Sequence, residues 1–522
     1  MLVLYAVIAS VTALRHEMWR DEMHAWQAVV ASDSLLELAA NVQSEGHPGL
    51  WFAVLYPVSR VTSDPVAMQL VHLGIALAVA AVVLLAAPLP AGWRVLFVFG
   101  YYPLYEYAAI SRNYAIGGLL LLVFCTLYGD RWKRPLVLAG VLALLAQASA
   151  VALILSFALG LMWLADAWSS RRMVHTRPAP AGAALALWLV GIMLSVWQLS
   201  GGRFVMQQAN PERRLHLLPF DIERIFDHTY VLDVLATPWQ GLVPLPRPQF
   251  AFWNSNILDC MANGDVLQAV LGIGLLAALG SLFLRCAPAF LLLAVGSLGM
   301  LAFSLLIYRG FLRHHGHFVL LLMAALWLRR VLQHGAGGRE GAAVSSGGPQ
   351  PWGAVVVSAL LAVNAAAGAY AVIREWREPF SAGQDVASFI RSQGLAGLPI
   401  VGQRDVEAAV VAGYLGQPIY CQALGREVPF IRWSLASRRP IEDAEAFRQA
   451  RFLAEERRSE ALILLRARGQ AQPDRVAGAV WVGHFPRSIV PSERFELYLV
   501  PRPGPAAQLS GAVPDPGPVP RG

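Results

Sequence analysis

The residues best suited to chemistry stand directly after the first apolar segment, in the run Trp19-Arg20-Asp21-Glu22-Met23-His24. A carboxylate here could take a proton from a hydroxyl or amine, and an arginine could hold a phosphate. Ionisable groups at the rim of a membrane span indicate a functional site, because lipid cannot solvate them. The same residues also fit a helix start, where acidic side chains meet unpaired N–H groups and the positive end of the dipole. Both interpretations remain open on this stretch alone.

Three further polar groups are predicted to reach the same side of the membrane. They are Glu45-Gly46-His47-Pro48, then Glu106 with Ser111-Arg112-Asn113-Tyr114, and then Tyr308-Arg309 with Arg313-His314-His315-Gly316-His317. We expect Glu45 to be a hydrogen-bond partner of His47. We expect Glu106 to pair with Arg112 only if the helix breaks between them.

Each of these groups also has a structural explanation. Arg112 could simply end a span, and Tyr114 could anchor at the lipid headgroups. The histidine run could bind a metal, but adjacent histidines cannot both point one way on a helix, so a phosphate-binding or interface role is favoured. An unpaired carboxylate at Glu106, inside a span, is harder to explain structurally because its burial is costly.

The composition is that of an integral membrane protein. Of 522 residues, 56% are hydrophobic and 14% charged, whereas about a quarter of an ordinary soluble domain is charged. The net charge is +7 with Lys133 as the only lysine, and we expect no nucleic-acid partner. The cysteines form no CxxC pair or zinc-like spacing, so no metal or disulfide framework is indicated: they are Cys125, Cys260, Cys286 and Cys421. Residues 1–14 predict a first span rather than a cleaved signal peptide, because they lack a basic n-region and a cleavage site.

Hydrophobic runs predict an α-helical polytopic membrane protein with about eleven transmembrane helices, since a bilayer core of about 30 Å needs roughly 20 apolar residues per helix. The predicted spans are 1–14, 66–88, 94–110, 114–129, 135–149, 150–166, 180–200, 266–284, 287–308, 317–333 and 352–373. The fifth and sixth form one apolar run that is divided at Gln147-Ala148-Ser149.

The positive-inside rule predicts a cytoplasmic N-terminus. With that orientation the inner loops carry most of the basic residues, and the short outer loops carry only Arg112, Arg309 and Arg313. The two long loops, 15–65 and 201–265, and the C-terminal region then lie outside the cytoplasm. All four polar groups fall on this outer side, although the charge rule does not depend on them.

The loops and the C-terminal region have distinct predicted structures. Ser34-Leu-Leu-Glu37 fits a capping box that opens a short helix through Val42. Residues 334–351 predict a flexible linker. Residues 374–500 predict a small extracytoplasmic α/β domain. Its strands are expected near 398–401, 419–421, 461–465 and 497–500, and its helices over 405–415 and 442–458. The Pro-rich residues 501–522 predict a disordered tail.

At these motifs the sequence resembles the GT-C superfamily of multi-span glycosyltransferases. The branch it resembles includes protein O-mannosyltransferases, the lipid A aminoarabinose transferase and RgtA/B/C/D-like bacterial enzymes. The matching residues are Arg20-Asp21-Glu22, Gly46-His47-Pro48-Gly49-Leu50-Trp51, Ser111-Arg112-Asn113-Tyr114 and Arg313-His314-His315-Gly316. The resemblance covers roughly residues 1–330, forming a transmembrane catalytic domain over 1–373. Gly49 departs from the pattern, because a second proline is common there.

The resemblance implies an inverting glycosyltransferase in the bacterial inner membrane, with a polyprenyl-phosphate-linked sugar as donor and a glycan, lipid or protein as acceptor. It places acid–base work on Asp21, with Glu22 as its partner or an acceptor contact. The donor phosphate would lie against Arg112, Arg313 and His314. The remaining substrate or loop contacts would be Arg20, His24, Glu45, His47, Glu106, Tyr114 and His315. The resemblance leaves a divalent metal open, because only some members use one, and no other cofactor is implied.

Two other functions remain as alternatives. A transporter or flippase of polyprenyl-linked glycans should carry ionisable residues near the midplane of several spans, whereas here they cluster at one rim. A polymer ligase with a diphosphate-linked donor also combines many spans with large outer loops. The acidic pair directly after the first span favours the monophosphate donor over the ligase.

Overall fold

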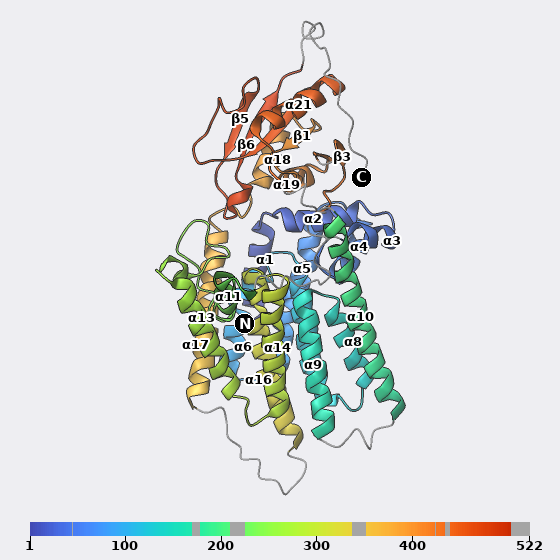
Figure 1. Ribbon diagram of the computed structural model, residues 1–522, viewed down its shortest axis with the longest axis vertical. Coiled ribbons are helices and arrows are strands. Elements are labelled where there is room, and N and C mark those ends of the chain that lie inside the picture. Colours follow the sequence, from blue (N-terminus) through green and yellow to red (C-terminus); the bar gives the residue numbers. More distant parts are fainter. Residues whose placement is uncertain are drawn as a thin grey trace. The chain divides into compact units, whose positions relative to one another are not determined.

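The computed structural model describes residues 1–43, 45–169, 178–208, 225–336, 351–422, 424–433 and 439–502 of the chain (Figure 1). These residues divide into two compact units. The first is Met1–Phe380 together with two later segments, Arg432–Leu435 and Ser488–Pro491. The second consists of the other described residues from Ser381 onward.

The first unit is helical, and seven of its described helices are long and apolar enough to cross a membrane. They are α5 (Val66–Ala86), α9 (Ala150–Ser169), α10 (Pro178–Gln208), α13 (Gly264–Ser281), α14 (Ala287–Leu306), α16 (His317–Ala336) and α17 (Pro351–Glu375). Shorter apolar helices are α1 (Leu2–Arg15), α4 (Leu50–Ser59), α7 (Tyr114–Leu127) and α8 (Pro135–Ala146). A multi-pass membrane protein is supported, while the predicted number of eleven spans is not established.

The predicted span 94–110 is interrupted. It contains α6 (Ala91–Val98) and then the π-helix η1 (Tyr101–Glu106). Pro103 lies inside η1 and has no N–H to donate to a preceding turn, which disfavours a regular α-helix there. The chain then turns through 107–113 and begins α7 at Tyr114. This turn brings Ser111 and Arg112 to the end of the bundle.

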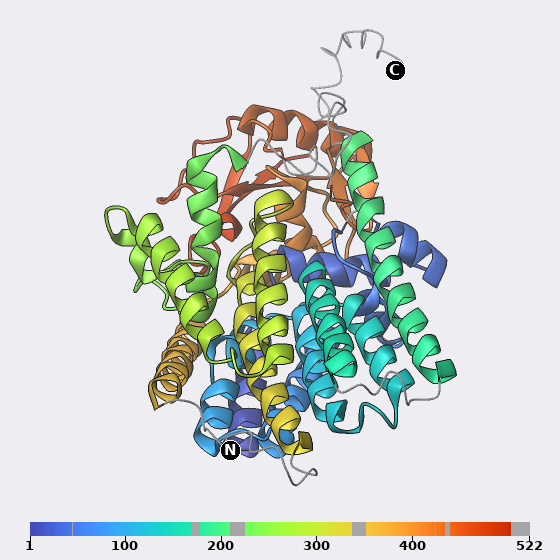
Figure 2. The same ribbon diagram turned by 60° about the horizontal axis from the view of Figure 1, so that its bottom comes forward.

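Helices α8 and α9 are separate, as the sequence predicts, with the break at 147–149. The hydroxyl of Ser149 accepts the N–H of Ala152 and so caps α9. Helix α8 packs against both α9 and α10, and α9 also packs against α14, as Figures 1 and 2 show.

The first predicted loop folds into α2 (Arg20–Val30), α3 (Leu35–Asn41) and α4. Ser34 caps α3 by accepting the Glu37 N–H, as predicted, while the Glu37 carboxylate accepts the N–H of Asp33 rather than that of Ser34. Asp21 and Glu22 lie in the first turn of α2. The helix-start interpretation of this stretch is therefore confirmed, and it does not exclude a site.

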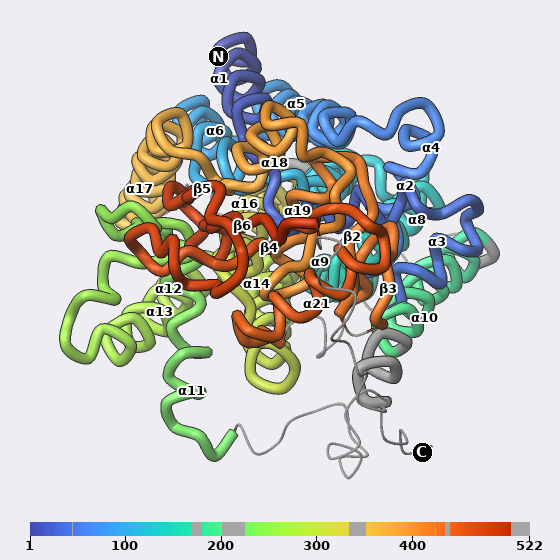
Figure 3. The backbone as a smooth tube through the Cα atoms, turned by 90° about the horizontal axis from the view of Figure 1, so that it is seen from above, coloured from blue at the N-terminus to red at the C-terminus, as the bar shows by residue number. Residues whose placement is uncertain are grey.

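The second predicted loop begins later than expected, because α10 continues to Gln208. Its described part contains α11 (His228–Leu235), α12 (Thr237–Leu242) and the 3-10 helix η6 (Ile257–Cys260), and α12 lies beside α13 (Figure 3). Residues 209–224 of this loop, 337–350 of the predicted linker and 503–522 of the predicted tail lie outside the described residues.

The second unit contains a mixed four-stranded sheet in the order β1-β4-β6-β5. Its strands are β1 (Ile400–Gly402), β4 (Ala461–Arg466), β5 (Val480–Phe485) and β6 (Phe495–Val500), and only β1 and β4 are parallel. β2 (Ile419–Cys421) and β3 (Arg426–Val428) form a separate antiparallel pair. The helices are α18 (Gly383–Ser392), α19 (Asp405–Leu415) and α21 (Asp443–Arg457). The predicted strands and helices are present, while α18, β3 and β5 were missed.

Candidate active site

The carboxylate of Asp21 lies among guanidinium groups from distant parts of the chain. Its Oδ2 is 3.7 Å from Nη1 of Arg112 and 3.4 Å from Nη2 of Arg313, and these arginines lie 91 and 292 residues further along the chain. Nη1 of Arg112 also donates to the Asp21 backbone carbonyl at 2.6 Å. On the other side, Nε of Arg20 lies 3.8 Å from Oδ1. The fold thus assembles one carboxylate and three arginines from the start of α2, the turn before α7, and α15 (Leu312–His315).

Electrostatics keep Asp21 ionised. Burial on its own raises the pKa of Asp21, but the charges of Arg112, Arg313 and Arg20 outweigh it and lower the pKa below the ordinary value of 3.8. The carboxylate is therefore charged at neutral pH. It is also a weak base as long as it shares these arginines.

Arg112 is also in contact with His47, whose Nε2 is 3.4 Å from Nη2. A guanidinium only donates, so Nε2 must accept and Nδ1 carries the proton, an assignment that follows from the hydrogen-bond network. Burial, with the charges of Arg112 and Arg313, lowers the pKa of His47 to about 3. His47 is thus a neutral hydrogen-bond donor. The predicted pairing of His47 with Glu45 is wrong.

Three buried donors beside Asp21 have no hydrogen-bond partner among the described residues. They are Nε of Arg112, Nε of Arg313 and Nδ1 of His47. Buried donors are normally satisfied, and each one left without a partner is costly. A group with several acceptor oxygens, such as a phosphate, would satisfy them and match the positive charge.

Glu45 has different partners from the one predicted. Its carboxylate is bonded to Nε2 of His24 and accepts the indole N–H of Trp433 at 3.0 Å. The His24 and Trp433 rings are 4.8 Å apart. His24 and Glu45 therefore hold the turn that carries His47.

Glu22 does not face the arginines, although it follows Asp21 directly. Its side chain is fully buried, with Oε2 2.8 Å from Nε2 of His16 and Oε1 accepting the N–H of Ser111 at 2.5 Å. Nδ1 of His16 is 2.7 Å from Glu375 at the end of α17. Burial alone would lower the pKa of His16, but Glu22 and Glu375 raise it well above 6.5. The Glu22 carboxylate is therefore bonded to His16 and Ser111 and lies away from the Asp21 cluster, unlike the expected partner of Asp21.

Glu106 also differs from the expectation. The helix breaks after it, but its Oε2 accepts the hydroxyl of Tyr101 at 3.1 Å and the indole N–H of Trp253 at 3.0 Å rather than pairing with Arg112. Trp253, Trp19 and Phe311 surround the guanidinium of Arg313. The sequence did not point to these aromatic residues, because isolated tryptophans and phenylalanines carry no spacing signal. The only hint was the position of Trp19 next to Arg20.

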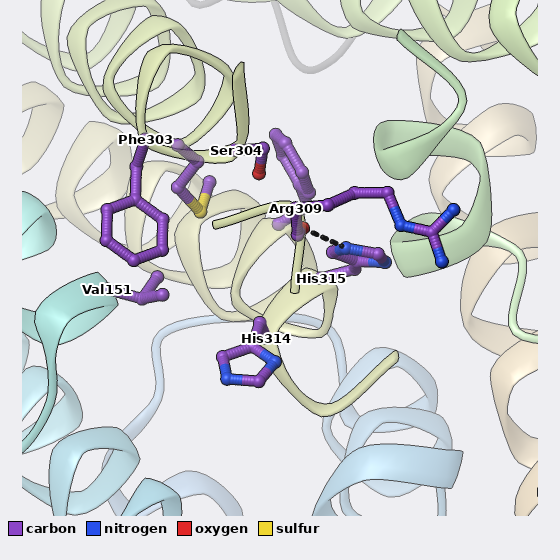
Figure 4. A pocket seen from close by; sticks show the side chains of 8 residues that line it. Val151, Phe303, Ser304, Arg309, His314 and His315 are labelled. Carbon is purple, nitrogen blue, oxygen red and sulfur yellow. Dashed lines mark hydrogen bonds between the residues drawn. The ribbon is translucent and has the colours of Figure 1, made fainter. Parts of the chain in front are cut away.

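The two adjacent histidines point to different sides (Figure 4). Nδ1 of His314 accepts the N–H of Phe311 at 2.9 Å, so its Nε2–H faces the hydroxyl of Tyr114 at 3.0 Å. Nε2 of His315 donates to the carbonyl of Arg309 at 3.0 Å. The pocket between them has a volume of about 10 Å³, which is at the lower limit for one water molecule. Across the described residues, no group of three or more His, Cys, Asp or Glu side chains is arranged to hold a metal ion.

Gly49 has a local reason to replace a proline. Its N–H donates to Oε1 of Gln198 on α10 at 2.7 Å, and Nε2 of Gln198 donates to Gln147 at 2.6 Å. A proline at this position has no N–H to donate. The Gly46–Gly49 turn is therefore tied to α10 through a contact that a second proline would abolish.

Comparisons with known proteins give a weak structural similarity. No protein-family model matches the chain, and no curated protein does either. It is similar to the crystal structure of ArnT from Cupriavidus metallidurans bound to undecaprenyl phosphate, with a TM-score of 0.47 and 14% identity over 95% of this chain and 97% of that one. For the apo state of the same protein the TM-score is 0.48, with the same identity and coverage. Because both TM-scores are below 0.5, this similarity carries no argument about function.

Proposed function

We propose that this protein is an inverting glycosyltransferase that moves a sugar from a polyprenyl-phosphate donor to an acceptor on the non-cytoplasmic side of the membrane. The observation that carries the proposal is the position of the Asp21 carboxylate between Arg112 and Arg313, next to three buried donors that have no partner in the described part of the chain. The resemblance of the four sequence motifs to GT-C enzymes supports the same function.

In this proposal Arg112 and Arg313 bind the donor phosphate and Asp21 is the base. The acceptor hydroxyl or amine attacks the anomeric carbon and loses its proton to Asp21, while the bond between that carbon and the phosphate oxygen breaks. The bonding electrons leave with the lipid phosphate, which gains a negative charge. The arginines then bind it more strongly than they bound the donor, which stabilises the transition state.

Donor binding also explains how Asp21, a weak base in the free protein, can accept a proton. In the absence of a donor the arginines stabilise the ionised form of Asp21. A bound phosphate neutralises part of their charge, so that the pKa of Asp21 rises and the carboxylate becomes a stronger base. The base is thereby activated only when the donor is in place.

The other predicted residues take supporting roles. Both ring nitrogens of His314 are engaged, so we assign it to holding Tyr114, which lines the path of the lipid. Arg20 contributes to the charge around Asp21, and His47 is a neutral donor toward the phosphate. His24 with Glu45 and His315 with Arg309 hold the surrounding loops.

The test is transfer from a polyprenyl-phosphate sugar by purified protein carrying Asp21→Asn. Loss of a general base typically costs 10²–10⁴-fold, so we expect turnover to fall by at least about 100-fold. Asp64→Asn is a matched control, because Asp64 is an exposed carboxylate that accepts the backbone N–H of Val66. Full activity in Asp21→Asn would exclude the mechanism.

The donor comparison separates the alternatives. Transfer from the monophosphate lipid but not from the diphosphate lipid is expected, and the opposite preference would indicate a polymer ligase. Movement of the lipid-linked sugar across liposomes without any acceptor would indicate a flippase.

A further inference from the structure

The guanidinium of Arg313 lies inside an aromatic cage, which we define as Trp19, Trp253 and Phe311. Its central carbon is 5.3 Å from the ring centre of Trp19, 5.6 Å from that of Trp253 and 4.9 Å from that of Phe311. Buried cation–π contacts of this kind are stronger than exposed ones. The hydrogen bond from Arg313 to Asp21 is long, at 3.4 Å, and the three rings help to fix the guanidinium.

One wall of this cage depends on a carboxylate behind it. Trp253 lies in an irregular segment between α12 and η6, so no helix or strand fixes its ring. Its indole N–H donates to Oε2 of Glu106 at 3.0 Å, and its ring meets that of Trp19 edge-on at 4.9 Å. Glu106 thus lies behind Trp253, and Trp253 lies against Arg313.

The buried position of Glu106 is unfavourable for the stability of the fold. It is 1% exposed and forms no ion pair in the described part of the chain. Its Oε2 accepts from Tyr101 and Trp253, whereas its buried Oε1 has no partner there. Burying a carboxylate without an ion pair costs free energy that two neutral donors offset only in part.

We propose that Glu106 is a positioning residue that fixes Trp253, and through it the Arg313 guanidinium, beside Asp21. The inference rests on the proposed function, because it deepens the role of Arg313 in holding the donor phosphate. Glu106 acts through Trp253 and does not itself contact the substrate.

Two substitutions of Glu106 distinguish the effect of its charge from that of its hydrogen bonds. In Glu106→Gln the amide oxygen can accept both Tyr101 and Trp253, and the new NH₂ replaces an oxygen that has no partner among the described residues. In Glu106→Leu no acceptor remains, so Trp253 loses its hydrogen bond and is held only by its ring contacts with Trp19 and Phe380. Trp253→Phe removes the N–H and so breaks the same link from the other side. Trp93→Phe is a matched control, because its buried N–H bonds to Ser358 and not to any group of the site.

The experiment uses the full chain in detergent and two readouts. The first is modification of Arg313 by an arginine-specific dicarbonyl reagent, followed by mass spectrometry. The second is the affinity for undecaprenyl phosphate. We expect Glu106→Leu and Trp253→Phe to raise Arg313 modification and to weaken lipid affinity roughly tenfold, as for the loss of one or two buried cation–π contacts. The double variant should be no worse than either single variant, because both break one link.

Glu106→Gln and Trp93→Phe should leave both readouts unchanged. Unchanged Arg313 modification in Glu106→Leu would overturn the inference, and so would a Glu106→Gln variant as impaired as Glu106→Leu, because the charge would then act directly. If Arg313 becomes reactive in Glu106→Leu while the wild-type chain does not bind undecaprenyl phosphate, the positioning role stands and the proposed function fails.

Discussion

Asp21 and Glu22 are neighbours in α2, yet their carboxylates lie in separate clusters: Oδ2 of Asp21 is 3.4 Å from Arg313, and Oε2 of Glu22 is 2.8 Å from His16. Successive side chains of an α-helix point about 100° apart, so those of Asp21 and Glu22 contact different parts of the protein. The Asp21 cluster is partly open to solvent, with 14% of the side chain exposed, while the Glu22 cluster is closed. The first cluster is suited to a ligand and the second to holding helices together.

Glu22→Gln should therefore destabilise the protein more than it changes substrate affinity. It removes one of two carboxylates bonded to the buried His16, and breaking a buried ion pair typically costs about 3–5 kcal/mol. Thermal unfolding in detergent measures the loss. Glu37→Gln is a suitable control, because Glu37 is exposed and its carboxylate accepts the N–H of Asp33. Equal unfolding temperatures for the two variants would contradict the role assigned to Glu22.

The stability of the fold should fall as the pH rises above neutrality. The pKa of His16 is raised well above its ordinary value of 6.5 by Glu22 and Glu375, against the effect of burial. A raised folded pKa stabilises the protein fully below pH 6.5, and this stabilisation is lost as the pH rises through the folded pKa. Unfolding temperatures measured from pH 6 upward report the loss.

A second group must be separated from His16 in that measurement. Burial, with a contribution from Glu375, raises the pKa of Glu17 from 4.5 to about 7. Because the folded pKa of Glu17 is the higher one, the folded state loses stability as the pH rises from 4.5 to about 7, and this loss is complete near neutrality. A decline that continues at higher pH belongs to His16, and it should become smaller in Glu375→Gln, because Glu22 alone then raises the pKa of His16. A decline as large as that of the wild-type chain would show that another group titrates.

Arg112→Gln should shift the acid limb of the pH–rate profile upward. Burial raises the pKa of Asp21, and Arg112 is the first of the charges that lower it. Without Arg112 the carboxylate protonates at a higher pH, so kcat/KM, which reports the free enzyme, should begin to fall at a higher pH than in the wild type. An acid limb at the wild-type position, with only KM changed, would mean that Asp21 is not the group whose protonation stops the reaction.

The sequence predicted what depends on local patterns. Apolar runs marked the helices, Ser34 marked a cap, and Gln147-Ala148-Ser149 marked the break between α8 and α9. The partners of buried polar groups were harder to predict, because they depend on tertiary packing. His16 bonds to Glu375 across 359 residues, and Glu45 takes His24 and Trp433 rather than the nearby His47. Charged residues at one rim predicted the Asp21 cluster, whereas the cage around Arg313 is built from residues with no repeated spacing.

Gly49→Pro should destabilise the turn that carries His47. The φ of Gly49 is −78°, which a proline can adopt, so the change acts through the lost N–H bond to Gln198. An acceptor left without its donor in a buried place costs about 1–3 kcal/mol. Gly49→Ala is the matched control, because it keeps the N–H and places its Cβ 3.3 Å from Oε1 of Gln198. Unfolding temperatures and the donor KM should change clearly in Gly49→Pro and less in Gly49→Ala, and Gln198→Leu should add nothing to Gly49→Pro beyond its own loss of Gln147. If Gly49→Ala were as damaging as Gly49→Pro, space around the turn rather than the hydrogen bond would be the cause.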